Sequence, residues 1–172
     1  HHRGSAFGRR PAGQPAQIDF ENRLSIALLK QRARGSDPLV VEDEGKLIGR
    51  CYLPEGLQTR IRQSSRVVID EPLEARVQVT LEDYVTGPLD EYARHYGDEQ
   101  GFEQLADALL SAMDRIRKRL GGARHQSLRG ELESALERQR RGGDPEGHRG
   151  WIRELLSGYY DPMYDYMLQR RN

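Results

Sequence analysis

The sequence of 172 residues has a single cysteine and only three lysines among its 27 basic residues. One cysteine excludes an internal disulfide and a CxxC metal motif, and this sparing use of thiols fits a cytoplasmic protein. No apolar run reaches the about 18 residues that cross a membrane, and the basic N-terminus lacks the apolar segment of a signal peptide. We therefore expect no membrane partner and no metal site.

The charge is balanced, because 27 acidic residues match the basic ones, so net charge favours no class of partner. Twenty-four of the basic residues are Arg. Arg matches the geometry of phosphate and carboxylate groups, but a GC-rich genome produces the same bias. The balance is broken locally: residues 1–34 carry seven basic side chains against two acidic ones, and residues 115–129 carry six and none.

Apolar periodicity predicts a mainly helical chain. The stripe in residues 99–120 is the clearest, since Leu105, Leu109 and Ile116 recur at helical spacing and Gly121 follows as a stop. Asp161 and Pro162 are predicted to cap the last helix. The expected helices are 18–34, 53–63, 72–85, 89–96, 99–120, 124–141, 145–157 and 162–170.

Two short apolar runs break this pattern. PLVVEDE (38–44) and RVVIDEP (66–72) each end in acids, which is typical of buried parallel strands that deliver carboxylates to one edge of a sheet. A helix between them predicts a parallel α/β sheet, and two strands alone leave that sheet incomplete. The expected fold class is therefore α/β, with residues 1–88 in part of an α/β domain and residues 89–172 in a helical extension.

Two stretches near the start suit a phosphate. The loop RGSAFG offers Gly4, Ser5 and neighbouring Arg3 for backbone and side-chain contacts, although an ordinary loop is the commoner interpretation. Glu42 and Glu44 would stand at the predicted sheet edge, where ligands bind and Mg²⁺ is held, or in a solvated turn. The loop is no Walker A motif, because it lacks the GK[ST] ending.

Two further stretches suit a nucleic acid. The basic run 115–129 fits a phosphate backbone, and equally a charged helix end. The tyrosines of YYDPMYDYM (159–167) could stack on unpaired bases, but packing of a terminal helix is favoured. No His lies near Cys51 in the sequence, so we expect a structural thiol there and assign no catalytic residue to this chain.

Several motifs together resemble one family, the tRNA 2-selenouridine synthases. They are HRGSAFGR (2–9), VVEDEGKLIGRCYLPEGL (40–57), YGDEQG (96–101), KRLG (118–121) and YYDPMYDYML (159–168), in the family's order. On this resemblance the opening HRGS is native sequence and no remnant of a purification tag. The resemblance covers nearly the whole chain.

The resemblance implies an enzyme with a rhodanese-like domain and a P-loop domain. It implies replacement of sulfur by selenium in wobble 2-thiouridine of tRNA, with selenophosphate as donor and an S-geranylated intermediate made from geranyl diphosphate. The rhodanese domain, its cysteine and the Walker A loop are missing here. This chain is therefore expected to be the C-terminal part, an incomplete P-loop NTPase-like parallel sheet with a helical extension, inactive without its own upstream regions.

The resemblance and the residues together give a set of candidate contacts. Phosphorylated substrates are assigned to Arg3, Gly4, Ser5, Glu42, Glu44 and Arg76, with Mg²⁺ as an optional ion. The tRNA backbone is assigned to Arg9, Arg10, Arg117, Lys118 and Arg119. Two other functions stay open: a P-loop kinase relative acting on nucleotides or small molecules, and a non-catalytic helical RNA-binding module.

Overall fold

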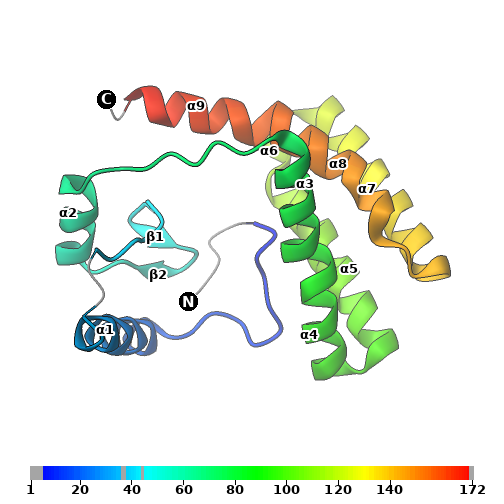
Figure 1. Cartoon of the computed structure of the whole chain (residues 1–172). Coiled ribbons are helices and arrows are strands. Elements are labelled where there is room, and N and C mark those ends of the chain that lie inside the picture. The colour runs from blue at the N-terminus through cyan, green and yellow to red at the C-terminus, as the bar shows by residue number, and fades with distance from the viewer. Residues whose placement is uncertain (1–5, 36–37, 44, 171–172) are drawn as a thin grey trace. The chain divides into compact units, whose positions relative to one another are not determined.

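In the computed structural model the chain is mostly helical and divides into two compact units, residues 1–69 and 70–172 (Figure 1). The structure describes residues 6–35, 38–43 and 45–170. The expected boundary between residues 88 and 89 falls in the first turn of α4 (Gly87–Tyr96). The division of roles between two domains stays a prediction.

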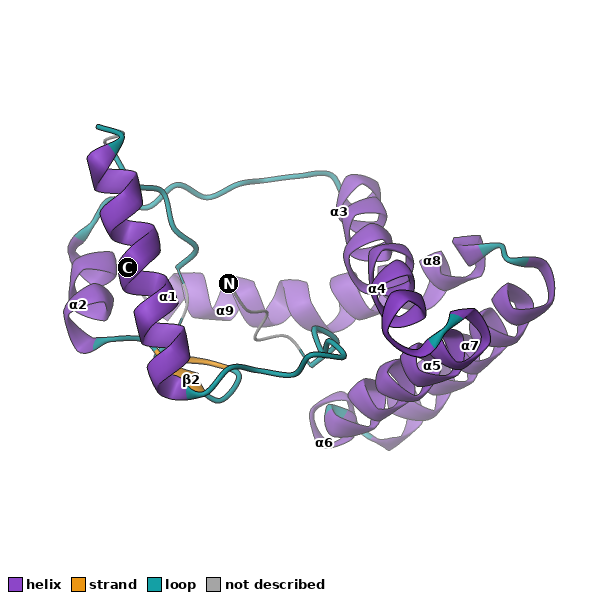
Figure 2. Ribbon diagram, turned by 90° about the horizontal axis from the view of Figure 1, so that it is seen from below, coloured by secondary structure: helices purple, strands orange, loops and turns teal. Residues whose placement is uncertain are grey.

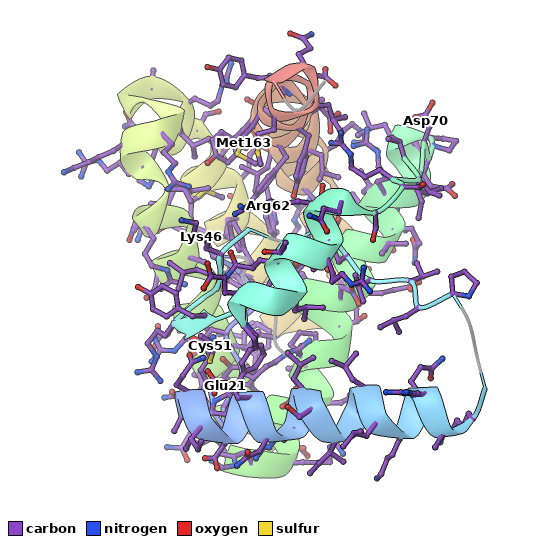
Figure 3. All side chains as sticks on the ribbon, turned by 90° about the vertical axis from the view of Figure 1, so that its left-hand side faces the viewer. Glu21, Lys46, Cys51, Arg62, Asp70 and Met163 are labelled. Atoms are coloured by element: carbon purple, nitrogen blue, oxygen red, sulfur yellow. The ribbon has the colours of Figure 1, made fainter. Side chains whose placement is uncertain are left out.

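The N-terminal unit is small and has a small core. It contains α1 (Gln17–Ala33), a hairpin of β1 (Leu47–Ile48) and β2 (Cys51–Tyr52), and α2 (Glu55–Gln63). Phe20 of α1 packs against Cys51 and Leu53, and Figure 3 shows Cys51 beside α1. The thiol is 1% exposed, as expected of a structural cysteine.

Two glutamine side chains attach the hairpin to the start of α1. The Gln17 amide exchanges a pair of hydrogen bonds with the backbone of Tyr52, both 2.9 Å long, much as a neighbouring strand would. The Gln14 amide donates to the Ile48 carbonyl at 2.7 Å and accepts from the Arg50 N–H at 2.8 Å. Gly49 turns the hairpin with φ of +61°, and a Cβ there would meet the Gln14 amide.

The two predicted parallel strands are absent from the described residues, so the predicted parallel sheet is not confirmed. Residues 38–43 and 65–70 are extended without strand pairing, and the sheet that the described residues form is a two-stranded antiparallel hairpin. Val40 is 87% exposed, and Val67 and Ile69 are 88% and 80% exposed. A strand needs a neighbouring strand to pair with its backbone, and in the described residues the pairing is confined to β1 and β2.

The C-terminal unit is a helical assembly close to the predicted one. α4 packs on α5 (Asp98–Arg115), and α3 (Leu73–Leu81) packs on α8 (Arg149–Leu155). Figure 2 shows α5 and α7 (Gly122–Gly142) running side by side. Gly97 and Gly121, with φ of +85° and +82°, turn the chain between α4 and α5 and between α6 and α7. Its elements are α3 (Leu73–Leu81), η1 (Glu82–Thr86), α4, α5 (Asp98–Arg115), α6 (Arg117–Leu120), α7 (Gly122–Gly142), η2 (Pro145–His148), α8 (Arg149–Leu155), η3 (Leu156–Tyr160) and α9 (Asp161–Arg170).

The core of this unit comes from the predicted apolar stripe and its partners. Leu109 of α5, Leu132 of α7 and Ile152 of α8 are at most 1% exposed. Trp151 and His148 are buried with them and hydrogen-bonded to each other. The stripe in residues 99–120 is thus confirmed as the buried face of the helix, which ends at Arg115 and resumes as α6.

Two turns of π-helix interrupt the helices, and each ends just before a proline. In η1 the Gly87 N–H donates to the Glu82 carbonyl, and Pro88 follows. In η3 the Asp161 N–H donates to the Leu156 carbonyl, and Pro162 follows. Proline lacks an N–H and crowds the carbonyl four residues earlier, so the wider turn removes the clash without ending the helix.

This continuity corrects the predicted cap at Asp161. Asp161 has helical φ and ψ, so α8, η3 and α9 follow one another as one bent rod (Figure 1). Its carboxylate does not cap a helix start but binds Arg76. Pro162 has no N–H to donate to the Gly158 carbonyl, which accepts a hydrogen bond from the Arg124 side chain at 2.7 Å instead.

Candidate nucleic-acid interface

Three consecutive basic residues, Arg117, Lys118 and Arg119, occupy the short helix α6 between α5 and α7. We call them the basic corner. Ile116 and Leu120 on either side are 4% and 8% exposed and anchor this turn in the core. The three side chains between these anchors are exposed, so the local sequence pattern itself presents positive charge to solvent.

The neighbouring basic residues are already engaged. Asp114 lies 3.0 Å from His125 Nε2 and 3.2 Å from Arg129 Nε, and Arg129 also pairs with Glu133. By contrast, Arg117 and Lys118 form no ion pair within the described residues. Arg117 and Lys118 on α6 therefore carry charge that no carboxylate of the described residues neutralises.

A group of tyrosines lies against this corner. Arg119 Nη1 is 3.5 Å from the hydroxyl oxygen of Tyr159, and this contact raises the pKa of Arg119. The ring of Tyr160 contacts that of Tyr159 edge-on, with centroids 4.9 Å apart. It also stacks on Tyr164, with centroids 6.2 Å apart and planes 23° from parallel. We call Tyr159, Tyr160 and Tyr164 the tyrosine cluster.

The cluster is only partly packed. Tyr159 and Tyr160 are half-buried, whereas Tyr164 is 54% exposed. α9, which carries Tyr164, packs in the described residues mainly against the preceding turn η3. Packing of a terminal helix is the favoured interpretation of the tyrosine motif. It therefore accounts for Tyr159 and Tyr160, whereas Tyr164 and Tyr166 are 54% and 56% exposed.

The contact between these two motifs depends on Arg124, which belongs to the basic run but is not among the predicted contact residues. Arg124, at the start of α7, donates to the Gly158 carbonyl and so attaches η3 to the end of the basic run. The signal in the sequence is Pro162. It has no N–H to donate to the Gly158 carbonyl, so this carbonyl needs another hydrogen-bond donor. Without the fold, nothing in the sequence indicates that Arg124 is its partner.

Arg76, predicted to contact a phosphorylated substrate, forms a bidentate ion pair with Asp161. The two N–O distances are 2.5 Å and 3.0 Å, and Arg76 Nε also donates to the Glu71 carbonyl at 3.1 Å. The hydrogen bond to Asp161 raises the pKa of Arg76. In this arrangement the guanidinium joins the start of α3 to the start of α9, and its contact with a substrate stays a prediction.

The other predicted contacts lie in the N-terminal unit. Glu42 is exposed in the extended segment 38–43, and Arg9 and Arg10 lie in the irregular stretch before α1. Arg3, Gly4, Ser5 and Glu44 lie outside the described residues. Glu42, Arg9 and Arg10 therefore belong to one unit and the basic corner to the other.

Metal and proton chemistry find little support in the described residues. Among them, no group of three or more His, Cys, Asp or Glu side chains is placed to hold a metal ion. His148 is 0% exposed, and burial, aided by the positive charge of Arg138, lowers its pKa to about 4. No helix in the described ranges is long and apolar enough to cross a bilayer.

The fold and the surface define a helical domain with a basic, tyrosine-lined corner. A family model described as "tRNA 2-selenouridine synthase AAA domain" matches residues 1–172, and the chain belongs to this family. The chain is also similar to curated proteins named "tRNA 2-selenouridine synthase". It is 64% identical over 171 residues to the protein of Alcanivorax borkumensis and 50% identical over 171 residues to that of Marinobacter nauticus. The identity is 54% over 172 residues in Hahella chejuensis.

These relatives are longer than the chain. Each match covers 99% of this chain, but only 47% of the Alcanivorax and Marinobacter proteins and 45% of the Hahella protein. The chain thus spans about half the length of the curated relatives that it matches. No solved structure matches it.

Proposed function

We propose that this chain is the part of a tRNA 2-selenouridine synthase that holds tRNA through the basic corner. In the proposed reaction the full-length enzyme replaces sulfur by selenium in wobble 2-thiouridine. Selenophosphate and geranyl diphosphate are the proposed co-substrates, and the protein is placed in the cytoplasm. Membership of the family and the names of the relatives support the role in tRNA modification. The two co-substrates are taken from the family resemblance.

The proposed chemistry has two displacements. The thiocarbonyl sulfur attacks the allylic carbon of geranyl diphosphate, a carbon–sulfur bond forms, and diphosphate leaves. The selenium of selenophosphate then attacks C2 of the base, and geranyl thiolate leaves. Water cleaves the selenium–phosphorus bond, and phosphate is released. Both donors carry phosphate, so the complete site must neutralise negative charge with Arg side chains, backbone N–H groups or Mg²⁺. No residue of this chain is assigned a role in bond making or breaking.

The observation that carries the tRNA contact is the exposed charge on α6. Arg117 and Lys118 are exposed without an ion pair in the described chain, so a phosphate would not have to displace a carboxylate. Phosphate contacts of this kind release counterions, and affinity then falls steeply with salt. The proposal predicts that part of the salt dependence of tRNA binding resides in these two residues.

A charge reversal in the full-length protein tests this. Arg117→Glu with Lys118→Glu should weaken binding of a tRNA transcript at low salt and flatten the plot of log affinity against log salt by about one per lost contact. Arg60→Glu with Arg62→Glu is the matched control, because it makes the same charge change on the exposed side of α2. An unaltered slope in the α6 variant, or an equal loss in the control, would contradict the contact.

We also propose that residues 39–41 and 67–69 are strands of a P-loop-like parallel sheet in the full-length protein. Both segments consist mainly of β-branched residues, are exposed, and have a hairpin and α2 between them. Parallel strands need such a crossover of about a dozen residues or more. More than half of the Alcanivorax relative lies outside the match, which leaves ample chain for the remaining strands. Glu42 would then stand at the carboxyl edge, where α/β folds bind ligands.

Amide hydrogen exchange distinguishes the two states of these segments. Paired central strands exchange through global or large-scale opening, so residues 39–41 and 67–69 should exchange at least about a hundredfold slower in the full-length protein than in an unstructured peptide. Measurement at two protein concentrations separates pairing within one molecule from pairing between copies. Exchange as fast as in the peptide, or protection that appears only at the higher concentration, would refute the sheet.

A further inference from the structure

We propose that the exposed ring of Tyr164, beside the basic corner, stacks on an unpaired base of the bound RNA. This rests on the proposed tRNA contact and names the structural element of the RNA that the surface takes. The tyrosine cluster combines aromatic rings with an adjacent cation, which is the arrangement that proteins use to hold single strands. The two motifs are about forty residues apart in sequence and are brought together only by the fold.

The geometry gives each tyrosine a different part. Tyr159 contacts Arg119, at 3.5 Å, and Tyr160 fills the space between Tyr159 and Tyr164. Tyr164 is the most exposed of the three, at 54%. Its ring lies nearly parallel to that of Tyr160, so Tyr160 holds the orientation in which Tyr164 presents a face. A base placed on Tyr164 would extend this stack by one ring.

The charges nearby favour a polyanion over a basic or neutral partner. Arg117, Lys118 and Arg119 are all exposed on α6, and the chain from Arg115 to Arg129 contains no acid. Asp161, the acidic residue next to the cluster, is neutralised by Arg76. Asp165, the residue after Tyr164 on α9, is exposed and carries a negative charge that a phosphate would avoid. Bases rather than phosphates are therefore expected at Tyr164, with the backbone directed toward α6.

Unpaired nucleotides fit this surface better than a duplex. Bases in an A-form helix are stacked on one another and their faces are not available, whereas loop bases turn outward onto aromatic rings. Stacking on one aromatic ring changes affinity by about 1–3 kcal/mol on alanine substitution, or about five- to 150-fold. Loss of Tyr164 should therefore reduce the preference for single-stranded RNA and spare the electrostatic part of binding.

The test uses the full-length protein and three probes: a tRNA transcript, a single-stranded oligouridylate and an RNA duplex of equal length. Tyr164→Ala should weaken binding of the tRNA and the oligouridylate about tenfold. Binding of the duplex and the salt slope for tRNA should not change. Tyr164→Phe keeps the ring face and should bind as the parent protein does. Tyr52→Ala, which removes a 60% exposed tyrosine from the N-terminal unit, is the matched control.

The outcomes separate this proposal from that for the basic corner. If charge reversal on α6 flattens the salt slope while Tyr164→Ala leaves all affinities unchanged, the stacking proposal is overturned and the tRNA contact stands. Equal losses in Tyr164→Phe and Tyr164→Ala would assign the effect to the hydroxyl and also overturn it. Ultraviolet crosslinking of the unmodified protein to oligouridylate is independent of any folding defect. A crosslink on the peptide with Tyr164 is expected, and crosslinks confined to other peptides would refute the proposal.

Discussion

Acidification should destabilise the C-terminal unit through one buried residue, His148. Its Nδ1 accepts a hydrogen bond from Trp151 Nε1 at 3.0 Å, so the proton of the neutral ring is on Nε2, which donates to Gln139 Oε1 at 2.9 Å. A second proton would have to enter on Nδ1, where it would face the indole N–H. Protonation therefore breaks a hydrogen bond and places a charge in the core.

The magnitude follows from the two pKa values. The ordinary pKa of histidine is 6.5, and burial lowers that of His148 to about 4. Because the unfolded chain then binds the proton first, stability is constant above pH 6.5, falls as the pH drops from 6.5 to 4, and is level below that. The expected loss of unfolding free energy is about 1.4 kcal/mol at pH 5.5 and about 3 kcal/mol at pH 4.

Urea unfolding followed by tryptophan fluorescence measures this directly. Trp151 is the one tryptophan of the chain and is 1% exposed, so its emission reports on the helical unit. The comparison is with His148→Asn, whose amide oxygen offers Trp151 an acceptor but does not titrate. Other histidines and carboxylates titrate in both proteins and cancel in the difference. If the two proteins lose the same free energy between pH 7 and pH 4.5, the reasoning about His148 is refuted.

Three further predictions concern packing and ion pairs. Gly101→Ala should destabilise the chain by about 1–3 kcal/mol, because a Cβ would lie 2.6 Å from the Ala93 nitrogen of α4, whereas Gly130→Ala, in open space on α7, should stabilise it by about 0.5–1 kcal/mol. Thermal unfolding measures the stability change of both variants. Changes of the same sign would contradict the close approach of α4 and α5. Leu132→Ala should cost about 2–5 kcal/mol in urea unfolding, because the side chain is 0% exposed, against under about 1 kcal/mol for Leu168→Ala, where it is 39% exposed. Similar costs would place Leu132 outside the core. Asp161→Asn should cost only about 1 kcal/mol, since Arg76 and Asp161 are 36% and 30% exposed, and the cost should shrink at high salt. A cost that does not change with salt would show that packing, and not charge, holds the two helices.

The helices could be predicted because their signals are local. The stripe through Leu105, Leu109 and Ile116 specifies one buried face, and Gly121 supplies the positive φ that ends it. The π turns η1 and η3 could not be predicted from the apolar periodicity, because they depend on how a helix continues through Pro88 and Pro162. Aspartate before proline usually marks a helix start, and at Asp161 the tertiary ion pair with Arg76 took its place.

Strands and surfaces were less predictable for a different reason. An apolar run such as Val67–Ile69 predicts that a segment is buried, but it does not identify what buries it. Strand pairing depends on two segments, so one segment alone cannot predict it. In the same way the basic run predicted exposed charge on α6, while its contact with Tyr159 depends on how α7 packs on α8. The sequence therefore indicated each motif of the candidate interface, and the fold alone indicated that they adjoin.

The exposed apolar segments of the N-terminal unit have a consequence for the tendency of this protein to aggregate. Extended β-branched segments such as 39–41 and 67–69, with 45–88% of each side chain exposed, are templates for edge-to-edge aggregation. Each is followed at once by two acids, Glu42 and Asp43 after one and Asp70 and Glu71 after the other. Such charges act as gatekeepers, because stacking identical chains would bring like charges together. We expect the chain produced by itself to remain dispersed, and a variant with Asn or Gln at these four positions to form β-rich aggregates.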